Sequence, residues 1–275
     1  LNQKIGERIL CIVGPTASGK SSRAVEIALR GFVNPTSNVG FTKPNMGEII
    51  SVDSRQVYHG LDIGTEKMTV EEMRGVPHHL INIREASETY SAGDFVADAT
   101  RLIEDIASRG KLPILVGGTH FYFHALLHGL PMGIDANPLL REELEMLSTE
   151  ELYARVRSAD ARRAAELDPR NRRRLIRALE IIGVKGSVPI RPSTDSGSLF
   201  QVKWVVIDPP REELRARIDA RLERAFAHGL IDEVRRVRKT VGDARLNELG
   251  LEYKIVGEFL RGERAETSLI PVLSA

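Results

Sequence analysis

Residues 14–21 read Gly-Pro-Thr-Ala-Ser-Gly-Lys-Ser and match the phosphate-loop pattern G-x-x-x-x-G-K-[ST], the feature that most restricts how this chain can fold. The pattern forms a phosphate site only between a buried strand and a helix. The apolar residues 9–13 have the length and composition of a parallel strand, and residues 20–30 have a helical pattern with one apolar side. We therefore predict a strand, a phosphate loop and a helix here.

The residue types of the loop define its chemistry. Gly14 and Gly19 let the backbone turn tightly, so that its N–H groups surround an anionic oxygen at the positive end of the helix. Lys20 adds a full positive charge, and the hydroxyl of Ser21 suits the shell of a phosphate-bound Mg²⁺. The loop does not identify which phosphate it holds. The predicted phosphate-binding residues are Gly14, Pro15, Thr16, Ala17, Ser18, Gly19, Lys20 and Ser21.

Strand and helix signals alternate along much of the chain, which predicts a mostly parallel sheet covered by helices on both faces. Ser91 and Asp94 have the spacing of a capping box at the start of one helix. Cys11, in the first apolar strand, is the only cysteine of the sequence, so no disulfide framework is expected. Further strands are expected at residues 48–52, 78–83, 112–116 and 202–207, and further helices at residues 91–109, 211–228 and 231–239.

Strand signals are absent between about residues 131 and 182, where four helical patterns follow one another. We predict an α/β protein with a P-loop NTPase-like parallel sheet core, residues 1–130 and 201–275. We expect residues 131–200 to form an inserted helical subdomain, with a flexible return from residue 183. Residues 31–47 are rich in Gly, Asn, Pro and Ser and read as a surface insertion. The expected helices of the subdomain are residues 138–146, 149–157, 161–167 and 170–182.

The charge of the chain is small but unevenly distributed. The net charge of +1 argues against a strongly basic nucleic-acid binder, yet residues 155–177 hold nine arginines against three acidic residues, a local charge of +6. Such a cluster fits the phosphate backbone of a nucleic acid or a solvated helix face. No long apolar stretch or signal peptide is visible, so we expect no membrane span, no export and a cytoplasmic protein.

Polar residues at strand ends are the candidates for chemistry. Asp53 follows the strand at residues 48–52, and its carboxylate could accept a proton from an attacking group, join a metal shell or cap a helix. The amide of Gln56 suits a base edge. Thr119 follows two glycines and could reach a reacting centre or cap the next helix. Arg217 and Arg221, four residues apart, could clamp an anionic leaving group or pair with surface carboxylates.

Seven motifs occur in one order: residues 14–21, 51–58 (Ser-Val-Asp-Ser-Arg-Gln-Val-Tyr), 62–65 (Asp-Ile-Gly-Thr), 75–80 (Gly-Val-Pro-His-His-Leu), 116–119 (Val-Gly-Gly-Thr), 177–180 (Arg-Ala-Leu-Glu) and 229–234 (Gly-Leu-Ile-Asp-Glu-Val). Together they closely resemble the bacterial tRNA dimethylallyltransferases, over about residues 8–261. That family transfers a dimethylallyl group from its pyrophosphate to the N6 amine of the adenosine next to the anticodon. The resemblance therefore implies a monomeric Mg²⁺-dependent enzyme whose partners are dimethylallyl pyrophosphate and the tRNA anticodon stem-loop.

The resemblance also implies roles for the candidate residues. The phosphate loop would bind the donor pyrophosphate, with Mg²⁺ through Ser21, and Arg217 and Arg221 would neutralise the leaving group. Asp53 would take the proton from the attacking amine, with Lys20 and Thr119 at the reaction centre. An adenine flipped out of the anticodon loop would meet Asp53, Ser54, Arg55, Gln56 and Thr119. Further tRNA contacts are implied at Arg141, Arg173, Arg174, Leu175, Ile176 and Arg177.

The sequence departs from the family in three places. Residues 31–47 are longer than is usual in the family. His120 and Phe121 stand where relatives usually carry smaller or aliphatic residues, so we expect a changed channel wall. The sequence stops soon after Gly262, before the basic, aromatic C-terminal helix common in the family. We therefore expect a trimmed chain, with weaker tRNA binding or stability.

Three other functions fit parts of the pattern. A kinase for a small molecule or nucleotide would use the same loop for ATP, with the arginine-rich subdomain as its lid. A non-catalytic RNA-binding protein would keep the loop without its activity, and a related prenyltransferase would act on free adenine nucleotides. The ordered motifs and the helical subdomain favour the tRNA enzyme, as do the intact residues Lys20, Ser21, Asp53 and Thr119.

Overall fold

The computed structural model describes residues 7–31, 46–130, 137–189 and 200–274. The chain divides into two compact units, one formed by Leu1–Gly129 with Ser198–Ala275 and the other by Leu130–Gly197. Each unit has a hydrophobic core of its own. Most of the expected insertion at residues 31–47 and of the expected return at residues 183–200 lies outside the described residues.

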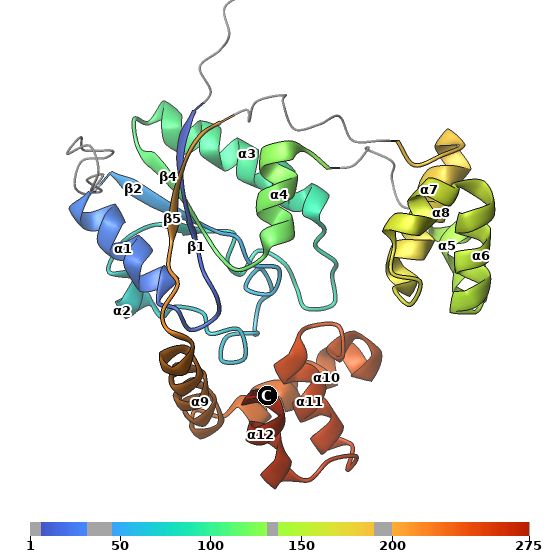
Figure 1. The fold of residues 1–275 in the computed structure, drawn as a ribbon. Helices are drawn as coiled ribbons and strands as arrows, with labels where there is room; N and C mark the ends of the chain where they lie inside the picture. The colour runs from blue at the N-terminus through green and yellow to red at the C-terminus, as the bar shows by residue number, and fades with distance from the viewer. Residues whose placement is uncertain (1–6, 32–45, 131–136, 190–199, 275) are drawn as a thin grey trace, which may run out of the picture. The chain divides into compact units, whose positions relative to one another are not determined.

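The first unit is built on a parallel five-stranded sheet, as predicted (Figure 1). In the strand order β3-β2-β4-β1-β5, the strand before the phosphate loop lies between β4 and β5. Leu10 of β1 pairs with Ile114 of β4 and with Lys203 of β5, which fixes the register at the centre of the sheet. The strands are β1 (Arg8–Val13), β2 (Gly47–Ser51), β3 (His78–His79), β4 (Leu112–Val116) and β5 (Gln201–Val206).

Helices cover both faces of this sheet, because the buried strands are apolar on both sides. On one face α1 (Lys20–Arg30) packs Ala24 and Ile27 against Leu10 and Ile12 of β1. On the other, α3 (Ala92–Ser108) and α4 (His120–His128) pack with Ile9 and other apolar side chains (Figure 1). The predicted capping box at the start of α3 is present. The α/β fold class predicted from the sequence is thus confirmed.

The third expected strand is much shorter than predicted. It was expected at residues 78–83, but β3 ends at His79 because Leu80 and Asn82 have left-handed backbone angles, φ 61° and 52°. The chain instead turns back on the segment after β2, where the N–H groups of Asn82 and Ile83 donate to the carbonyls of Gln56 and Val57. This loop-on-loop contact supports the segment that carries the candidate site residues.

The helices after β5 extend further than the sequence indicated. The helix expected at residues 231–239 runs as α10 (Leu230–Leu246), with a break at Gly242. Two helices that were not predicted follow it. Tyr253 and Val256 of the first of them join the main core. The remaining elements are α2 (Val70–Met73), α9 (Arg211–Ala227), α11 (Leu251–Leu260), the short 3-10 turn η1 (Glu266–Ser268) and α12 (Leu269–Ser274).

The second unit consists of four helices in its described part, close to the four that the sequence predicts. The last begins at Arg172 rather than at residue 170, because the Asn171 side chain caps it by accepting from the N–H of Arg174. It continues to Lys185, where Gly186 with φ 76° ends it. The helices are α5 (Pro138–Glu145), α6 (Thr149–Ala159), α7 (Ala161–Glu166) and α8 (Arg172–Lys185).

Candidate active site

The phosphate loop leaves the end of β1 and winds tightly into α1. A Cβ atom at Gly14 would stand 2.3 Å from the carbonyl oxygen of Ile207, so only glycine allows this approach to the chain after β5. Ala17 and Gly19 have left-handed angles, φ 58° and 86°, which turn the backbone around a central hollow. The first N–H groups of α1 lack intrahelical acceptors, so the loop offers an anion site.

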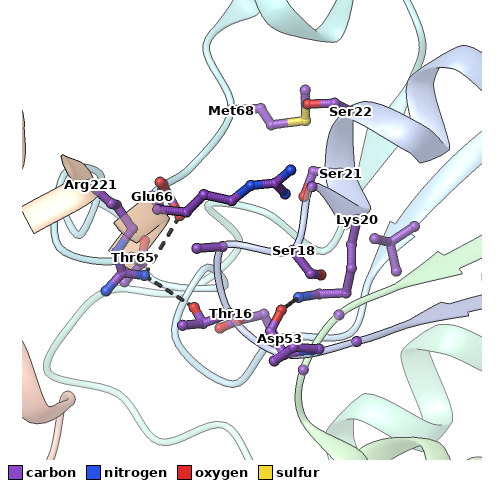
Figure 2. A pocket seen from close by; sticks show the side chains of 18 of the residues that line it. Thr16, Ser18, Lys20, Ser21, Ser22, Asp53, Thr65, Glu66, Met68 and Arg221 are labelled. Atoms are coloured by element: carbon purple, nitrogen blue, oxygen red, sulfur yellow. Dashed lines mark hydrogen bonds and ion pairs between the residues drawn. The ribbon is translucent and has the colours of Figure 1, made fainter. Parts of the chain in front are cut away.

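Lys20 is held over this hollow. Its Nζ atom donates to the Pro15 carbonyl at 2.5 Å, across the loop (Figure 2). Burial lowers the pKa of Lys20, and the nearby carboxylates of Asp53 and Glu66 act in the opposite direction. A phosphate in the hollow would supply the negative charge that the partly desolvated ammonium lacks. Ser21 follows at the same rim, half-buried.

Asp53 lies just beyond β2, at the carboxyl edge of the sheet where the phosphate loop also lies. Its Oδ1 atom accepts from the N–H groups of Arg55 (2.7 Å) and Gln56 (3.1 Å). These bonds fix the carboxylate through one oxygen. Within the described residues no hydrogen bond reaches Oδ2, which leaves this oxygen for a ligand.

Thr119 joins the loops that follow β2 and β4. Its Oγ1 atom accepts from the N–H of Ser54 at 3.2 Å, and its own N–H donates to the carbonyl of Val52 at 3.2 Å. The two loops touch so closely that a Cβ at Gly117 would stand 2.0 Å from the Val52 carbonyl oxygen. Thr119 occupies the N-cap position of α4, but its side chain makes no cap hydrogen bond. The hydroxyl therefore links the start of α4 to the segment that carries Asp53.

Gln56 is oriented by the protein on both ends of its amide. Its Oε1 atom accepts from the Ser51 hydroxyl at 3.0 Å, and its Nε2 atom donates to the Thr65 carbonyl at 3.1 Å. Nε2 also makes a longer contact, 3.5 Å, to the Glu66 carbonyl. A lone pair of Oε1 is left over for a ligand, which could also take the N–H of that longer contact. The Thr65 carbonyl can only accept, so Nε2 of the Gln56 amide must face it and Oε1 must face Ser51.

Arg221 of α9 reaches the phosphate loop (Figure 2). Its guanidinium donates to Thr16 Oγ1 (3.1 Å) and pairs with Glu252 (2.9 Å) and Glu66 (3.6 Å). Arg217, one turn earlier, pairs with Glu213 on the same helix at 2.6 Å. Both arginines thus face the loop with acidic partners that an anionic ligand would replace.

These groups line one cavity of about 810 Å³. It includes the whole phosphate loop, Asp53, Gln56, Arg217 and Arg221. Ser54, Arg55 and Thr119 do not line it, although Thr119 lies between two residues that do. Sequence reasoning missed several members of the wall; the motif at residues 62–65, which ends at one of them, was a usable signal. The missed residues are Ser22, Thr65, Glu66, Lys67, Met68, Glu72, Glu213, Ala216, Ala220 and Arg224.

The expected tRNA residues of the helical unit have unequal surroundings. Leu175 and Ile176 are buried in its core, so their side chains hold α8 in place instead of facing a ligand. Arg141 and Arg177 both pair with the buried Glu180. The outward-facing residues of the stretch are Arg173 and Arg174.

Two absences concern only the described parts of the chain. In those parts, no group of three or more His, Cys, Asp or Glu side chains could hold a metal ion by itself. Mg²⁺ fits the site nonetheless, because it commonly takes one or two protein oxygens and completes its shell with waters and substrate phosphates. Among the same residues, no helix is long and apolar enough to cross a membrane.

The family model for IPP transferases matches residues 56–272. The chain belongs to the IPP transferase family. Relatives of this family include a tRNA dimethylallyltransferase of Anaeromyxobacter sp. (strain Fw109-5), 40% identical over 93% of this chain and 83% of that protein. Another, from Thermomicrobium roseum, is 40% identical over 93% of this chain and 75% of its own length.

Solved structures of IPP transferases have the same fold. The tRNA isopentenylpyrophosphate transferase of Bacillus halodurans aligns with a TM-score of 0.66 at 37% identity, over 98% of this chain and 82% of that one. A eukaryotic dimethylallyltransferase acting on tRNA aligns with a TM-score of 0.78 at 26% identity, over 98% of this chain and 66% of that one. The phosphate loop, Asp53 and Arg221 therefore lie in a prenyltransferase fold.

Proposed function

We propose that this chain is a tRNA dimethylallyltransferase. It transfers a dimethylallyl group from dimethylallyl pyrophosphate to N6 of the adenosine adjacent to the anticodon and releases pyrophosphate. The observation that carries the proposal is the single cavity that joins the phosphate loop to the carboxylate of Asp53. Membership of the IPP transferase family and the names of the relatives support it.

The donor pyrophosphate binds in the phosphate loop. Its oxygens accept from the loop N–H groups and from Lys20, whose lowered pKa reflects burial that an anion would compensate. Arg221 and Arg217 lie at the far side of the same hollow and neutralise the charge that grows on the leaving group. These fixed positive charges therefore stabilise the negative charge that develops on pyrophosphate as the carbon–oxygen bond breaks.

Ser21 would hold Mg²⁺ through its hydroxyl, and the ion would supply further positive charge to the leaving group. The half-buried position of Ser21 at the rim of the hollow supports this assignment.

Asp53 acts as the base. The N6 nitrogen forms a bond to the allylic carbon while the carbon–oxygen bond to pyrophosphate breaks, and the amine proton passes to Asp53 Oδ2. The amide hydrogen bonds to Oδ1 and the tie from Thr119 hold the carboxylate in place for this step. The adenine is flipped out of the loop stack and meets Gln56, because the base must leave the stack to reach the cavity.

The helical unit binds the tRNA backbone through arginines whose side chains make no ion pair among the described residues. Arg157 and Arg170 are exposed and make no ion pair among the described residues. They line a shallow groove of about 410 Å³ together with Tyr153, an aromatic ring on which an unstacked base can lie. Arg174 is exposed on the first turn of α8. Arg174 was expected as a tRNA contact, and Arg157 and Arg170 lie in the arginine cluster seen in the sequence, so Tyr153 is the addition to the RNA footprint.

We propose that the enzyme works as a monomer in the cytoplasm, where its tRNA substrate is found.

The test supplies two donors to the purified chain. Labelled dimethylallyl pyrophosphate with Mg²⁺ and unmodified tRNA should give label in tRNA, and Lys20→Ala should abolish it. Label from ATP transferred to a small acceptor, with none from the prenyl donor to tRNA, would overturn the proposal in favour of a kinase. Free AMP as acceptor separates a tRNA enzyme from one that prenylates nucleotides.

A further inference from the structure

The carboxylate of Glu233 in α10 is buried, with 2% of the residue exposed, and it binds a loop instead of a cation. Its Oε2 atom accepts from the N–H groups of Asp62 (2.9 Å) and Ile63 (2.8 Å), and its Oε1 atom accepts from Gly64 (3.0 Å). No ion pair to Glu233 occurs within the described residues. A charge buried in this way is retained only where backbone donors compensate it.

Tyr253 of α11 supports the same carboxylate from the other side. Its hydroxyl donates to Glu233 Oε1 at 2.7 Å, and burial together with the Glu233 charge raises the pKa of Tyr253. A Cβ at Gly64 would stand 2.8 Å from the Tyr253 ring, so the loop and the ring are in direct contact. Two helices that follow β5 therefore fix three consecutive residues of a loop far away in the sequence.

The same loop also contacts Gln56. Thr65, the next residue after the three that Glu233 holds, offers its carbonyl to Gln56 Nε2 at 3.1 Å. The Ser51 hydroxyl donates to Gln56 Oε1 at 3.0 Å. Because the carbonyl cannot donate, the amide has one orientation, and both Gln56 and Thr65 line the cavity.

This orientation selects a base. A glutamine amide can accept from the N6 amine of adenine and donate to its N7 atom, whereas guanine has acceptors at both positions. A loop that moved away would free the amide to flip and lose this discrimination. We infer that Glu233 and Tyr253 are positioning residues, which act through residues 62–65 to fix the Gln56 amide in the orientation that recognises adenine. The inference rests on the proposed transfer to adenosine.

The test is a double-mutant cycle between Glu233→Gln and Gln56→Ala. In Glu233→Gln one acceptor oxygen becomes an NH₂ group, which cannot accept from the loop N–H groups. Tyr253→Phe removes one hydroxyl only and serves if Glu233→Gln does not fold. Glu48→Gln is the matched control, since Glu48 is a buried glutamate at the opposite end of the sheet. Each variant is assayed for kcat, for KM of tRNA and of donor, and for unfolding in urea.

We expect kcat/KM for tRNA to fall about tenfold or more in Glu233→Gln, with the donor KM within about twofold of wild type. In Tyr253→Phe the same ratio, kcat/KM for tRNA, should fall by about threefold. In the Gln56→Ala background Glu233→Gln should add little, because the residue through which it acts is already gone. Glu48→Gln should lower stability while leaving kcat/KM for tRNA unchanged.

Two results would overturn the inference. One is full additivity of Glu233→Gln and Gln56→Ala, which would mean that Glu233 does not act through Gln56. The other is a loss of kcat/KM in Glu48→Gln equal to that in Glu233→Gln, which would reduce the effect to stability. A wild-type chain that transfers no prenyl group to tRNA would overturn the proposed function, and this inference with it.

Discussion

The hydroxyl of Thr119 accepts a hydrogen bond from the backbone N–H of Ser54 at 3.2 Å, which ties the segment after β2 to the segment after β4. Asp53 precedes Ser54, so this bond helps to place its carboxylate. Thr119→Val keeps the shape but removes the acceptor, and kcat should fall about tenfold to a hundredfold. Thr119→Ser keeps the acceptor and should retain more of the activity. Steady-state kinetics of both variants check this, and equal losses in the two would contradict the role of the hydroxyl.

The close approach of the same two segments predicts unequal effects at neighbouring glycines. A Cβ at Gly117 would stand 2.0 Å from the Val52 carbonyl oxygen, whereas a Cβ at Gly118 would meet nothing within 4 Å. Gly117→Ala should therefore lower the free energy of unfolding by about 1–3 kcal/mol, and Gly118→Ala should leave it nearly unchanged. Urea unfolding of the pair measures this. Equal stability of the two variants would show that the segments can separate without cost.

Arg221 should not be replaceable by lysine. Its guanidinium contacts Thr16, Glu66 and Glu252 at once, a fork that a lysine ammonium cannot reproduce. We expect Arg221→Lys to raise the donor KM about tenfold. Arg101→Lys, at an exposed arginine of α3 paired with Asp98, should leave that KM unchanged. Donor titrations at saturating tRNA provide the measurement, and an unchanged KM in Arg221→Lys would exclude Arg221 from donor binding.

The candidate groups could be chosen from the sequence alone because they lie at the ends of strands. The apolar runs before Gly14, Asp53 and Gly117 predict strands, and parallel strands bring their carboxyl ends to one edge. The contacts of Glu233 could not be predicted, because its hydrogen bonds span about 170 residues of sequence and leave no local pattern. The early end of β3 depends on left-handed angles at Leu80, a residue type that gives no warning of them.

In the helical unit, the local charge pattern alone was a poor guide to which side chains face outward. Arg141 and Arg177 turn toward the buried Glu180, while Arg157 and Arg170 remain without an ion pair in the described chain. Ion pairing depends on neighbours brought together by packing, and a sequence does not show those neighbours. Burial of Leu175 and Ile176 follows from their apolar type, which a helical pattern already suggests.

The unpaired arginines predict a measurable salt dependence. Arg157→Ala and Arg170→Ala should each weaken tRNA binding and reduce the slope of log K against log salt by about one, as loss of a phosphate contact does. Arg235→Ala, at an exposed arginine of α10 that pairs with Asp232, should change neither. Filter binding over a range of salt concentrations provides the slopes. Slopes equal to wild type would place the RNA backbone elsewhere.

The buried Glu48 predicts acid sensitivity. The hydrogen bond from Arg109, with those from Lys111 and His79, holds the pKa of Glu48 well below its ordinary value of 4.5 despite burial, which acts in the opposite direction. The folded pKa lies below the unfolded one, so the stabilisation is present above about pH 4.5 and is lost as the pH falls. The free energy of unfolding of the wild type should exceed that of Glu48→Gln by about 1–3 kcal/mol at neutral pH, and this difference should narrow in acid. Urea unfolding at neutral and at acidic pH measures the difference. A difference that does not change with pH would contradict the lowered pKa of Glu48.

The central claim is that the carboxylate of Asp53 takes the amine proton beside a pyrophosphate held in the phosphate loop. Asp53→Asn keeps the acceptor that binds the Arg55 and Gln56 N–H groups but makes a poor base. The most direct measurement is the single-turnover rate of prenyl transfer to tRNA by this variant, with both substrates saturating and both affinities measured separately. The account predicts a rate at least about a hundredfold lower with affinities close to wild type. A rate equal to wild type would contradict it.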